Sequence, residues 1–563
     1  MAIGQVGFAQ NESLPTLSEQ PAQSPELAAL LQSDAPAAIR DYYNARGNAS
    51  IFLSGDAEAG RALIDALADQ HRHALPAADD LLAELTAHAT DAISGRGTAE
   101  GELAFARAWL NLAKQRLSGI VQPRALSSNM DRSLPELDEA ELMARLDGDA
   151  VEAIAGLMPD HPHYAQLLDL RAELERVVAA GDWAAGEIPS GGSIEAGDTD
   201  ARVPQIRARL RALGDYRDGG VPARETTLAG EEPLDGESTL DGEAPLDTVR
   251  AAPISQDGQR MDAVTVEALQ AFQRRHGLND DGVVGPKTLA ALNTTAEERL
   301  RQVLVNLERV RWTGWDRDAR HIYVNLPDYR ATLNVDGEEV FETRVVVGQA
   351  RHQTVEFSDT MTHMVVNPTW TVPRSIATEE ILPALRSNPN YLNENNMSLI
   401  DDGSGVWVPP DTSMINWANF SQSYFPWWIR QGPGPGNALG NVKFMFPNEH
   451  AIYLHDTPSR SLFARDARAF SHGCVRVADY RGLAEALLSP QMSDPMSTFD
   501  RHRSTGRETR VNLDVKPAVH IDYRTVWVDE DGRAQFRDDM YGRDELVLDA
   551  LIDLGVEVGA AQG

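Results

Sequence analysis

The chain has 563 residues, a length that predicts three or four domains at about 150 residues each. It carries 51 Lys and Arg against 85 Asp and Glu, and its net charge of −34 argues against a sequence-independent nucleic-acid binder and a polybasic membrane-surface protein. With 42% hydrophobic residues it can build real cores, so wholesale disorder is not expected.

The N-terminus and the longest apolar stretches bear on targeting. No uncharged apolar stretch approaches the ~20 residues that a membrane span requires. Residues 1–10 have no positive start, and two interpretations stay open: the remnant of a trimmed signal peptide, or an ordinary disordered start. We assign residues 1–23 to this leader or disordered start.

Residues 24–185 show a helical pattern. Apolar residues recur at three- and four-residue spacing, as in the stretches 62–67, 81–85, 103–112 and 167–177. The glycines at 191–192 and 197 predict a linker. The histidine pairs at 71 and 73 and at 161 and 163 have no carboxylate or thiol companions in the sequence, so we expect surface residues there and not metal ligands.

A second unit follows from about residue 200. Apolar spacing predicts helices over 203–213, ending at Gly214, then over 262–278 and after a turn at 281. Between the first two helices, residues 225–247 hold eight acids, no base and a short repeat of period six. We expect an extended surface insertion, since like charges repel. Calcium binding is the weaker alternative, because the spacing does not match an EF-hand loop.

The remainder alternates as strands. A helix over 300–311 precedes expected strands at 321–326, 331–341 (a hairpin turned at Asp336 and Gly337), 343–348 and 364–373. Residues from about 374 to 440 are rich in Asn, Pro, Gly and Trp, with one helix at 378–385; a long irregular insertion of this kind is often a lid or binding loop. Strands resume at 442–446, 451–456 and 511–539.

The single cysteine excludes an internal disulfide framework and a multi-cysteine metal site. Cys474 ends the run Ser471, His472, Gly473 and is followed two residues later by Arg476. A glycine before the cysteine permits a tight turn that exposes the thiol. A nucleophilic cysteine also needs an imidazole to take its proton. The alternative is a small buried hydrophobe, which the surrounding glycine, histidines and arginine disfavour.

Two histidines are candidate bases. His472 is poorly placed, because neighbouring side chains on a strand point to opposite faces. His455 ends an expected strand and is followed by Asp456, a candidate orienter through its carbonyl or its carboxylate. Fifteen residues separate His455 from Ser471, enough for a loop that returns to a neighbouring strand.

The pattern of His455, fifteen residues, and then residues 471–476 resembles the signature of the YkuD-like L,D-transpeptidase catalytic domain. Residues 430–448 and 453–458 resemble the large periplasmic members from Gram-negative bacteria. Residues 203–293, without the acidic insertion, resemble a peptidoglycan-binding type 1 domain, notably at 272–273, 276–278 and 281–282. Residues 41–43 and Arg46 are more loosely similar to the scaffold domain of those enzymes.

The resemblance implies a reaction. Cys474 attacks the carbonyl between the third residue of a tetrapeptide stem and its terminal D-Ala, D-Ala leaves, and a thioester forms. The side-chain amine of another stem resolves it into a 3–3 cross-link. His455 is the implied base and later acid, and backbone N–H groups near Gly473 and Cys474 stabilise the oxyanion. His472 is implied to fix the turn. No cofactor or metal is implied.

The resemblance also implies substrate-binding residues. These are Tyr453, Arg476, Ser471, Asp456, Trp370 and Trp427. For Arg476 a structural role, bracing the loop, is an equal alternative to holding a substrate carboxylate. For the tryptophans the alternative is core packing.

The expected fold is multidomain α+β. A helical scaffold domain spans 24–190, and a three-helix peptidoglycan-binding domain spans 191–295, with the acidic insertion at about 219–258. A β-rich YkuD-like sandwich, the catalytic domain, spans 296–540 with the lid insertion at about 374–440, and residues 541–563 form a C-terminal tail. The acidic insertion interrupts the binding module and leaves open whether the module binds glycan.

Three functions remain in competition. The first is the transpeptidase. The second keeps the thiol but changes the acceptor: an L,D-carboxypeptidase that uses water, or an enzyme that attaches or releases a wall-bound protein. The third is a non-catalytic wall-binding scaffold, which an intact His455 and Cys474 disfavour. The implied location is the periplasm, and the implied partners are peptidoglycan stem peptides, glycan and other cell-wall enzymes.

Overall fold

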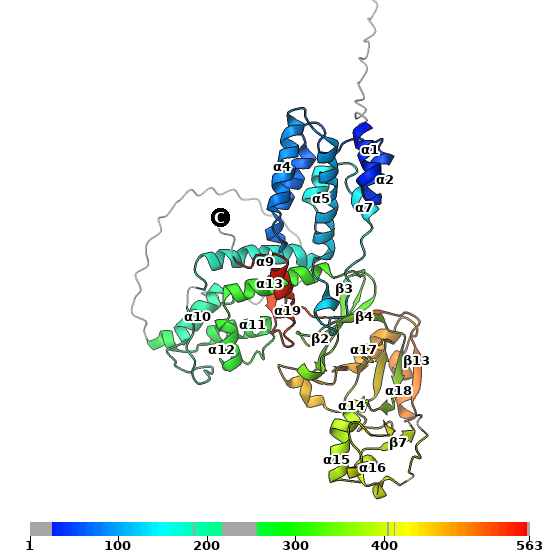
Figure 1. Ribbon diagram of the computed structural model, residues 1–563. Helices are drawn as coiled ribbons and strands as arrows, with labels where there is room; N and C mark the ends of the chain where they lie inside the picture. Colours follow the sequence, from blue (N-terminus) through cyan, green and yellow to red (C-terminus); the bar gives the residue numbers. More distant parts are fainter. Residues whose placement is uncertain are drawn as a thin grey trace, which may run out of the picture. The chain divides into compact units, whose positions relative to one another are not determined.

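The computed structural model describes residues 25–183, 186–216, 256–401, 403, 405–409 and 411–559 (Figure 1). The expected leader and the acidic insertion up to residue 255 lie outside these residues. The chain divides into two compact units: Met1–Gly119 with Pro135–Pro159, and Ile120–Leu134 with Asp160–Gly563. In the described part, no helix is both long enough and apolar enough to cross a membrane.

The first unit is helical, as the apolar spacing predicts. Its helices are α1 (Pro25–Asp34), α2 (Ala37–Ala45), α3 (Glu58–Ala68), η1 (Gln70–His73), α4 (Asp79–Ile93), α5 (Ala99–Ser118), α7 (Glu139–Ala144) and α8 (Ala150–Ala155). Helix α5 runs through the core and buries Phe105 and Trp109 completely. Its buried Glu102 accepts hydrogen bonds from the Tyr43 hydroxyl (2.6 Å) and the Ile51 N–H (2.7 Å), which ties the α2–α3 loop to the core.

The second unit begins with more helices. They are α6 (Pro123–Leu126), α9 (Pro162–Ala179), α10 (Val203–Ala212), η2 (Gln256–Gln259), α11 (Ala263–Arg275), α12 (Pro286–Asn293) and α13 (Ala296–Arg311). Helices α10, α11 and α12 share one core, so three helices stand where the sequence predicts them. The linker expected at 191–198 is wrong: Ile194 is buried in that core and pairs in a β-bridge with Val284.

The second unit also contains an 11-stranded mixed sheet, with strands in the order β13-β5-β9-β10-β12-β3-β2-β1-β14-β4 and with β11 beside β3. The strands are β1 (His321–Asn325), β2 (Arg330–Val335), β3 (Glu338–Gly348), β4 (Phe357–Thr360), β5 (His363–Val366), β9 (Val442–Met445), β10 (Leu454–His455), β11 (Ala469–Ser471), β12 (Val475–Val477), β13 (Thr509–Asn512) and β14 (Ala518–Asp522). Short 3₁₀ turns η3 (Ala350–His352) and η7 (Arg460–Ala464) lie between strands. The predicted turn joins β2 to β3, with Asp336 and Gly337 both at positive φ (52° and 81°).

Helices cover one apolar face of this sheet. Helix α17 (Tyr480–Leu488) and helix α18 (Pro495–Ser504) contribute Leu483, Leu487 and Phe499 to the core that the strands bury. One expected strand is shorter than predicted: β10 has two residues where the sequence predicted a strand from 451 to 456. Ala451 lies at φ 54°, a left-handed conformation that cannot continue a strand.

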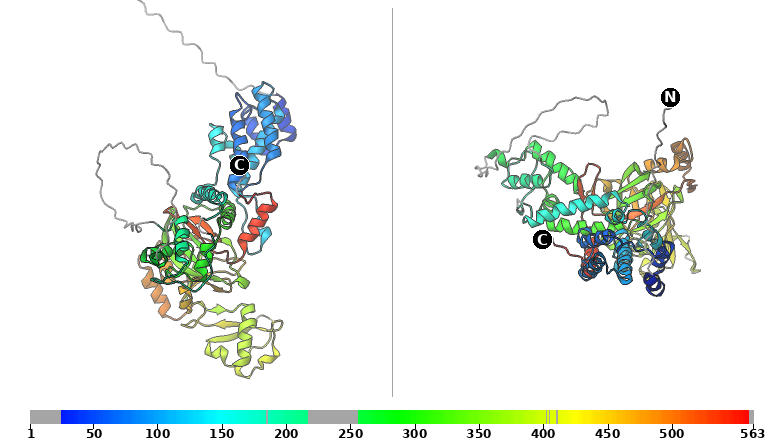
Figure 2. Two further views of the ribbon diagram at one scale, coloured as in Figure 1. Left: turned by 90° about the vertical axis from the view of Figure 1, so that its left-hand side faces the viewer. Right: turned by 90° about the horizontal axis from the view of Figure 1, so that it is seen from above.

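The insertion at 374–440, called the lid below, is not irregular as expected. Its elements are β7 (Met397–Asp401), β8 (Trp427–Gln431), α14 (Arg374–Ile376), η4 (Ala377–Ile381), α15 (Leu382–Ser387), α16 (Tyr391–Glu394), η5 (Thr412–Met414) and η6 (Trp417–Asn419), and β6 (Trp370–Thr371) pairs with β8 at its base. These elements enclose a separate apolar core. Figures 1 and 2 show the lid as a lobe of its own, in yellow-green.

The expected C-terminal tail also has structure. After β15 (Val526–Val528) and β16 (Ala534–Phe536), residues 543–553 form α19 (Arg543–Asp553), which buries Val547 and Leu551. Arg543 is 1% exposed and pairs with the buried Glu356 at 2.6 Å. A buried charge is stable only when paired, so this helix is an integral part of the second unit.

Candidate active site

Two adjacent strands carry the predicted catalytic pair. Strand β10 pairs with β12 in parallel, with Leu454 opposite Val475 and His455 opposite Arg476. Leu454 and Val475 are fully buried in the sheet core. Because side chains alternate along a strand, His455 and Arg476 lie on the other face.

The alternation extends one residue back along each strand. The N–H of Val475 donates to the carbonyl of Tyr453 at 3.1 Å, so the two segments remain paired there. Cys474 and Tyr453 therefore share the face of His455. The rings of Tyr453 and His455 lie 5.7 Å apart, and the Cys474 thiol donates to the carbonyl of Ala451 at 3.7 Å. The fold brings the thiol, the imidazole and the predicted tyrosine together.

The turn before Cys474 is shaped by Ser471 and Gly473. The Ser471 hydroxyl donates to the Cys474 carbonyl at 2.5 Å and accepts the Gly473 N–H at 3.1 Å. Gly473 lies at φ 112°, where side chains are strained, so glycine is required here by the backbone. Ser471 thus holds the turn. The N–H of Cys474 has no protein partner in the described part of the chain and is the available oxyanion donor.

The Gly473 carbonyl is anchored from behind. The Thr354 hydroxyl donates to it at 2.8 Å and accepts the Gly348 N–H at 2.9 Å, and Thr354 is fully buried. Arg543 donates to the Thr354 carbonyl at 2.8 Å. Since a peptide group is planar, fixing the Gly473 carbonyl also fixes the direction of the Cys474 N–H.

His455 has a defined tautomer. Its Nδ1 lies 2.5 Å from the carbonyl oxygen of Asp456, and since a carbonyl only accepts, Nδ1 carries the proton. Nε2 is then the free base. Burial, with a smaller contribution from the charge of Arg476, lowers the pKa of His455 to about 3, so the imidazole is neutral at pH 7.

The thiol is also neutral at rest. Burial raises the pKa of Cys474 above its ordinary value. Hydrogen bonds from Tyr453 and the charges of Arg476 and Lys443 act in the opposite direction without overcoming burial. The thiol and the imidazole on this face are therefore both neutral, which suits proton transfer during attack better than a preformed ion pair.

Two cations flank the pair. Lys443 on β9 stands opposite His455 in the antiparallel register, and its ammonium lies 5.9 Å from the Tyr453 ring centre. Burial lowers the pKa of Lys443 and of Arg476. The Nε of Arg476 is buried without a hydrogen-bond partner in the described residues. A buried donor left unpaired is costly, so Arg476 is suited to bind an anionic group.

His472 contacts the lid. Its ring lies 4.6 Å from that of His352, and its Nε2 lies 2.8 Å from a carboxylate oxygen of Glu380 in η4. Burial lowers the pKa of His472, and Glu380 opposes this shift. His472 therefore joins the catalytic turn to the lid.

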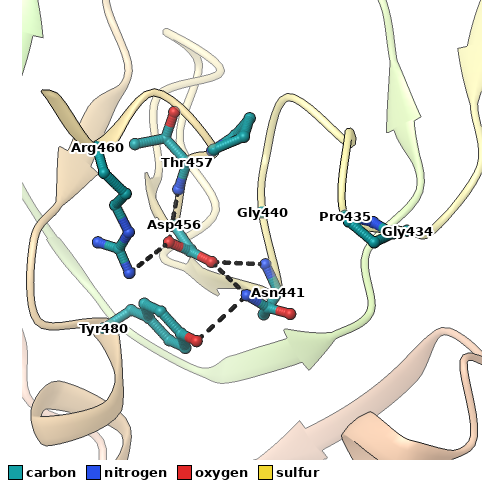
Figure 3. Close-up of a pocket in the computed structure, with 9 residues that line it drawn as sticks. Gly434, Pro435, Gly440, Asn441, Asp456, Thr457, Arg460 and Tyr480 are labelled. Atoms are coloured by element: carbon teal, nitrogen blue, oxygen red, sulfur yellow. Dashed lines mark hydrogen bonds and ion pairs between the residues drawn. The ribbon is translucent and has the colours of Figure 1, made fainter. Parts of the chain in front are cut away.

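Asp456 lies beside a separate cavity of about 220 Å³ (Figure 3). Its carboxylate accepts from the N–H and the side-chain amide of Asn441 (2.8 and 2.7 Å) and from the Thr457 N–H (2.7 Å). Arg460 completes the set at 3.2 Å. Asp456 is only 2% exposed, and its buried carboxylate braces the loop after β10. Its backbone carbonyl orients the His455 ring.

The two predicted tryptophans lie with the lid. Trp427 is 5% exposed and packs in the lid core with Trp417 and Phe425. Large apolar rings gain most by burial, which is the alternative considered above. Trp370 on β6 is half-buried against the same core.

Of the four histidines expected at the surface, His71 is exposed as expected and His163 is half-buried. His73 and His161 are buried, and His161 caps α9 by accepting the His163 N–H at 3.2 Å. A different group brings three potential metal-ligand atoms within 4.8 Å: Asp131, Glu449 and His450. Asp131 is already paired with His450 at 2.8 Å.

Three contributors to this site were missed by the sequence analysis. Lys443 sits in an alternating strand, but only the β9–β10 register places it beside His455. Thr354 and Glu380 carry no sequence signal, because a loop and an insertion bring them to the turn. No local pattern records such contacts.

Comparison with known proteins agrees with this geometry. Residues 319–511 match the family model of the YkuD L,D-transpeptidase catalytic domain. This segment is therefore similar to YkuD L,D-transpeptidase catalytic domains. The match is accompanied by matches to a "Scaffold domain" at 37–170 and a "Putative peptidoglycan binding domain" at 249–292.

A relative and two solved structures resemble the chain. A Haemophilus influenzae protein named "Putative L,D-transpeptidase" is 35% identical over 226 residues, covering 40% of this chain and 45% of that protein. This match thus spans less than half the length of the relative. An L,D-transpeptidase from Xylanimonas cellulosilytica is 14% identical over 60% of this chain and 100% of that one, with a TM-score of 0.18. A Clostridium acetobutylicum "Fused Zn-dependent amidase/peptidase/peptodoglycan-binding domain-containing protein" is 12% identical over 59% and 100%, with a TM-score of 0.15.

Proposed function

We propose that the protein is a peptidoglycan L,D-transpeptidase that forms 3–3 cross-links through a thioester on Cys474. The observation that carries the proposal is the common face of β10 and β12, on which a neutral His455 and the Cys474 thiol lie together. A thiol needs a base to become a nucleophile, and a buried imidazole with a free Nε2 is such a base. The family match of the catalytic domain supports the choice of reaction.

The first half-reaction uses this pair directly. Nε2 of His455 takes the thiol proton as Sγ of Cys474 attacks the carbonyl before the terminal D-Ala of a tetrapeptide stem. The N–H of Cys474 donates to the developing oxyanion. The C–N bond then breaks, His455 returns the proton to the leaving amine, and D-Ala departs, leaving a thioester.

The second half-reaction defines the class of enzyme. In a transpeptidase the side-chain amine of another stem attacks the thioester, an amide forms, and the thiol is regenerated. Water in place of the amine would make the protein an L,D-carboxypeptidase, and a protein amine or a protein-linked stem would make it an enzyme that attaches or releases a wall-bound protein. The cationic Arg476, with its unpaired buried Nε, is proposed to hold a stem carboxylate in either case.

The remaining domains give the setting. We infer that the three helices around α11 hold peptidoglycan near the catalytic domain, consistent with the family match at 249–292. Peptidoglycan stems and glycan lie outside the cytoplasmic membrane, so we place the protein in the periplasm. Glycan binding by the module is measured directly by pull-down with purified cell-wall sacculi.

The test is product analysis with purified tetrapeptide-bearing muropeptides. Mass spectrometry should find a cross-linked dimer together with released D-Ala, and Cys474→Ala should release none. Tripeptide without dimer would assign the protein as a carboxypeptidase. Full activity in Cys474→Ala would overturn the thiol mechanism. A carbapenem-type β-lactam should also add covalently to the wild type and not to Cys474→Ala.

A further inference from the structure

The charge around the thiol poses a problem for an amine acceptor. Lys443 and Arg476 both act on Cys474 and on His455, so the described site is cationic. An acceptor amine arrives from water as an ammonium ion, because an ordinary primary amine has a pKa near ~10. Like charges repel, so the site needs an anionic group where the acceptor enters.

Glu380 of the lid is placed to be that group. One carboxylate oxygen lies 2.8 Å from Nε2 of His472, two residues before the nucleophile, and the side chain is 48% exposed. The carboxylate also acts electrostatically on Arg476. Its second oxygen has no protein partner in the described residues. Glu380 thus combines proximity to the catalytic turn, access to solvent and a free acceptor.

Its position in the lid is also unusual. Glu380 lies in η4, a short π-helical turn between α14 and α15. Such turns occur rarely and often at functional sites. The π-helical turn η4 thus provides, through Glu380, the contact between the lid and His472 of the catalytic turn.

Other nearby carboxylates are already engaged. Glu508 acts on Lys443, but its carboxylate accepts from the Thr369 N–H and hydroxyl. Glu379, the neighbour of Glu380, accepts a hydrogen bond from Gln422 within the lid at 3.0 Å. Glu379 is therefore a matched control that carries the same charge on the same turn.

We propose that Glu380 binds the ammonium group of the acceptor stem and so selects an amine over water. The inference rests on the proposed thioester chemistry and deepens it. The docked ammonium loses one proton to water at the exposed carboxylate, and the neutral nitrogen attacks the thioester carbonyl. A C–N bond forms and the C–S bond breaks. The second nitrogen proton passes through His455 to the Cys474 sulfur, which restores the thiol.

The test measures how the thioester is partitioned. Full-length wild type, Glu380→Gln and Glu379→Gln are incubated with tetrapeptide muropeptides, and the ratio of cross-linked dimer to hydrolysed tripeptide is determined. Glutamine keeps an oxygen for His472 but loses the charge. We expect Glu380→Gln to lower the ratio about tenfold, the effect of a partly solvated charge pair, with first-turnover D-Ala release within about twofold of wild type. Glu379→Gln should match wild type.

A neutral nucleophile supplies the second control. Hydroxylamine is uncharged at neutral pH, so its attack on the thioester should be equally fast in wild type and Glu380→Gln. An unchanged dimer-to-tripeptide ratio in Glu380→Gln, or an equal loss with hydroxylamine, would overturn the acceptor role. A wild type that yields only tripeptide would do the same. Failure of the proposed function itself is distinguishable, because the wild type would then release no D-Ala.

Discussion

The catalytic sheet and the lid use side chains in opposite ways. His455 on the sheet and Thr354 in the loop between η3 and β4 are buried and each is held by at least one hydrogen bond, so burial sets protonation and neighbours set direction. On the lid, Glu380 is half-exposed and pairs with one side chain, His472, among the residues that the structure describes. The chemistry thus depends on a rigid, dry surface, whereas recognition of a second substrate is left to a solvated group that tolerates different occupants.

The largest effect is expected when the base on the sheet, His455, is removed. His455→Ala should slow acylation of Cys474 about 10³-fold or more, because the neutral thiol then has no proton acceptor. The measurement is the single-turnover rate of D-Ala release. A loss smaller than tenfold would mean that another group serves as the base. Circular dichroism and the melting temperature check that the variant is folded.

Two tryptophans test whether the lid folds as a unit of its own. Trp427→Ala removes a buried ring from the lid core and should destabilise the lid by about 3 kcal/mol, whereas Trp407→Ala, with Trp407 71% exposed, should change its stability by less than about 0.5 kcal/mol. Hydrogen exchange of lid amides measures both.

In Trp427→Ala the alkylation of Cys474 by iodoacetamide should stay close to wild type, since the sheet is intact. Equal exchange in the two variants would contradict the separate lid core.

Lowering the pH should destabilise the sheet before it destabilises the lid. Burial lowers the pKa of His455 and of His520 to about 3, while the unfolded chain binds these protons near pH 6.5. The unfolded state therefore holds more protons below pH 6.5, and stability falls as the pH drops. At pH 5 each histidine should contribute a loss of about 2 kcal/mol. Denaturant titrations at pH 7 and pH 5 measure it, and His520→Gln should reduce the difference; equal stability at both pH values would refute the buried neutral state.

The smallest expected effect concerns the direction of one N–H group. Thr354→Val keeps the shape of the side chain but frees the Gly473 carbonyl, so acylation should slow about tenfold, as when an oxyanion donor is loosened. Alkylation of Cys474 by iodoacetamide forms no oxyanion and should stay within about twofold. Thr354→Ser keeps the hydroxyl and should restore acylation. Equal losses in both reactions would point to general damage of the turn.

The sequence predicted what local patterns encode. The helices of the first unit, the three helices of the small module and the hairpin at Asp336 follow from apolar spacing and turn residues. The motif and the alternation of side chains along a strand predicted His455 as the base for Cys474. These features depend on residues close in the chain or on a short loop between neighbouring strands.

What the sequence did not predict depends on distant contacts. Helix α19 was expected as a tail, yet Arg543 is buried because Glu356, far away in the chain, neutralises it. The segment at 191–198 was expected as a linker because of its glycines, but the isoleucines beside them pack into a core. Trp427 was expected at a binding surface, and the lid core around it became visible only when the insertion was found to be folded.

The covalent thioester on Cys474 is the intermediate whose detection tests the proposed reaction most directly. Full-length protein is mixed with tetrapeptide muropeptide, quenched in acid within the first turnover, and weighed intact by mass spectrometry. The predicted result is an adduct whose mass equals that of the tetrapeptide muropeptide minus one molecule of free D-Ala, mapped to the Cys474 peptide in wild type and absent from Cys474→Ala. D-Ala release without any adduct on Cys474, or the same adduct in Cys474→Ala, would contradict it.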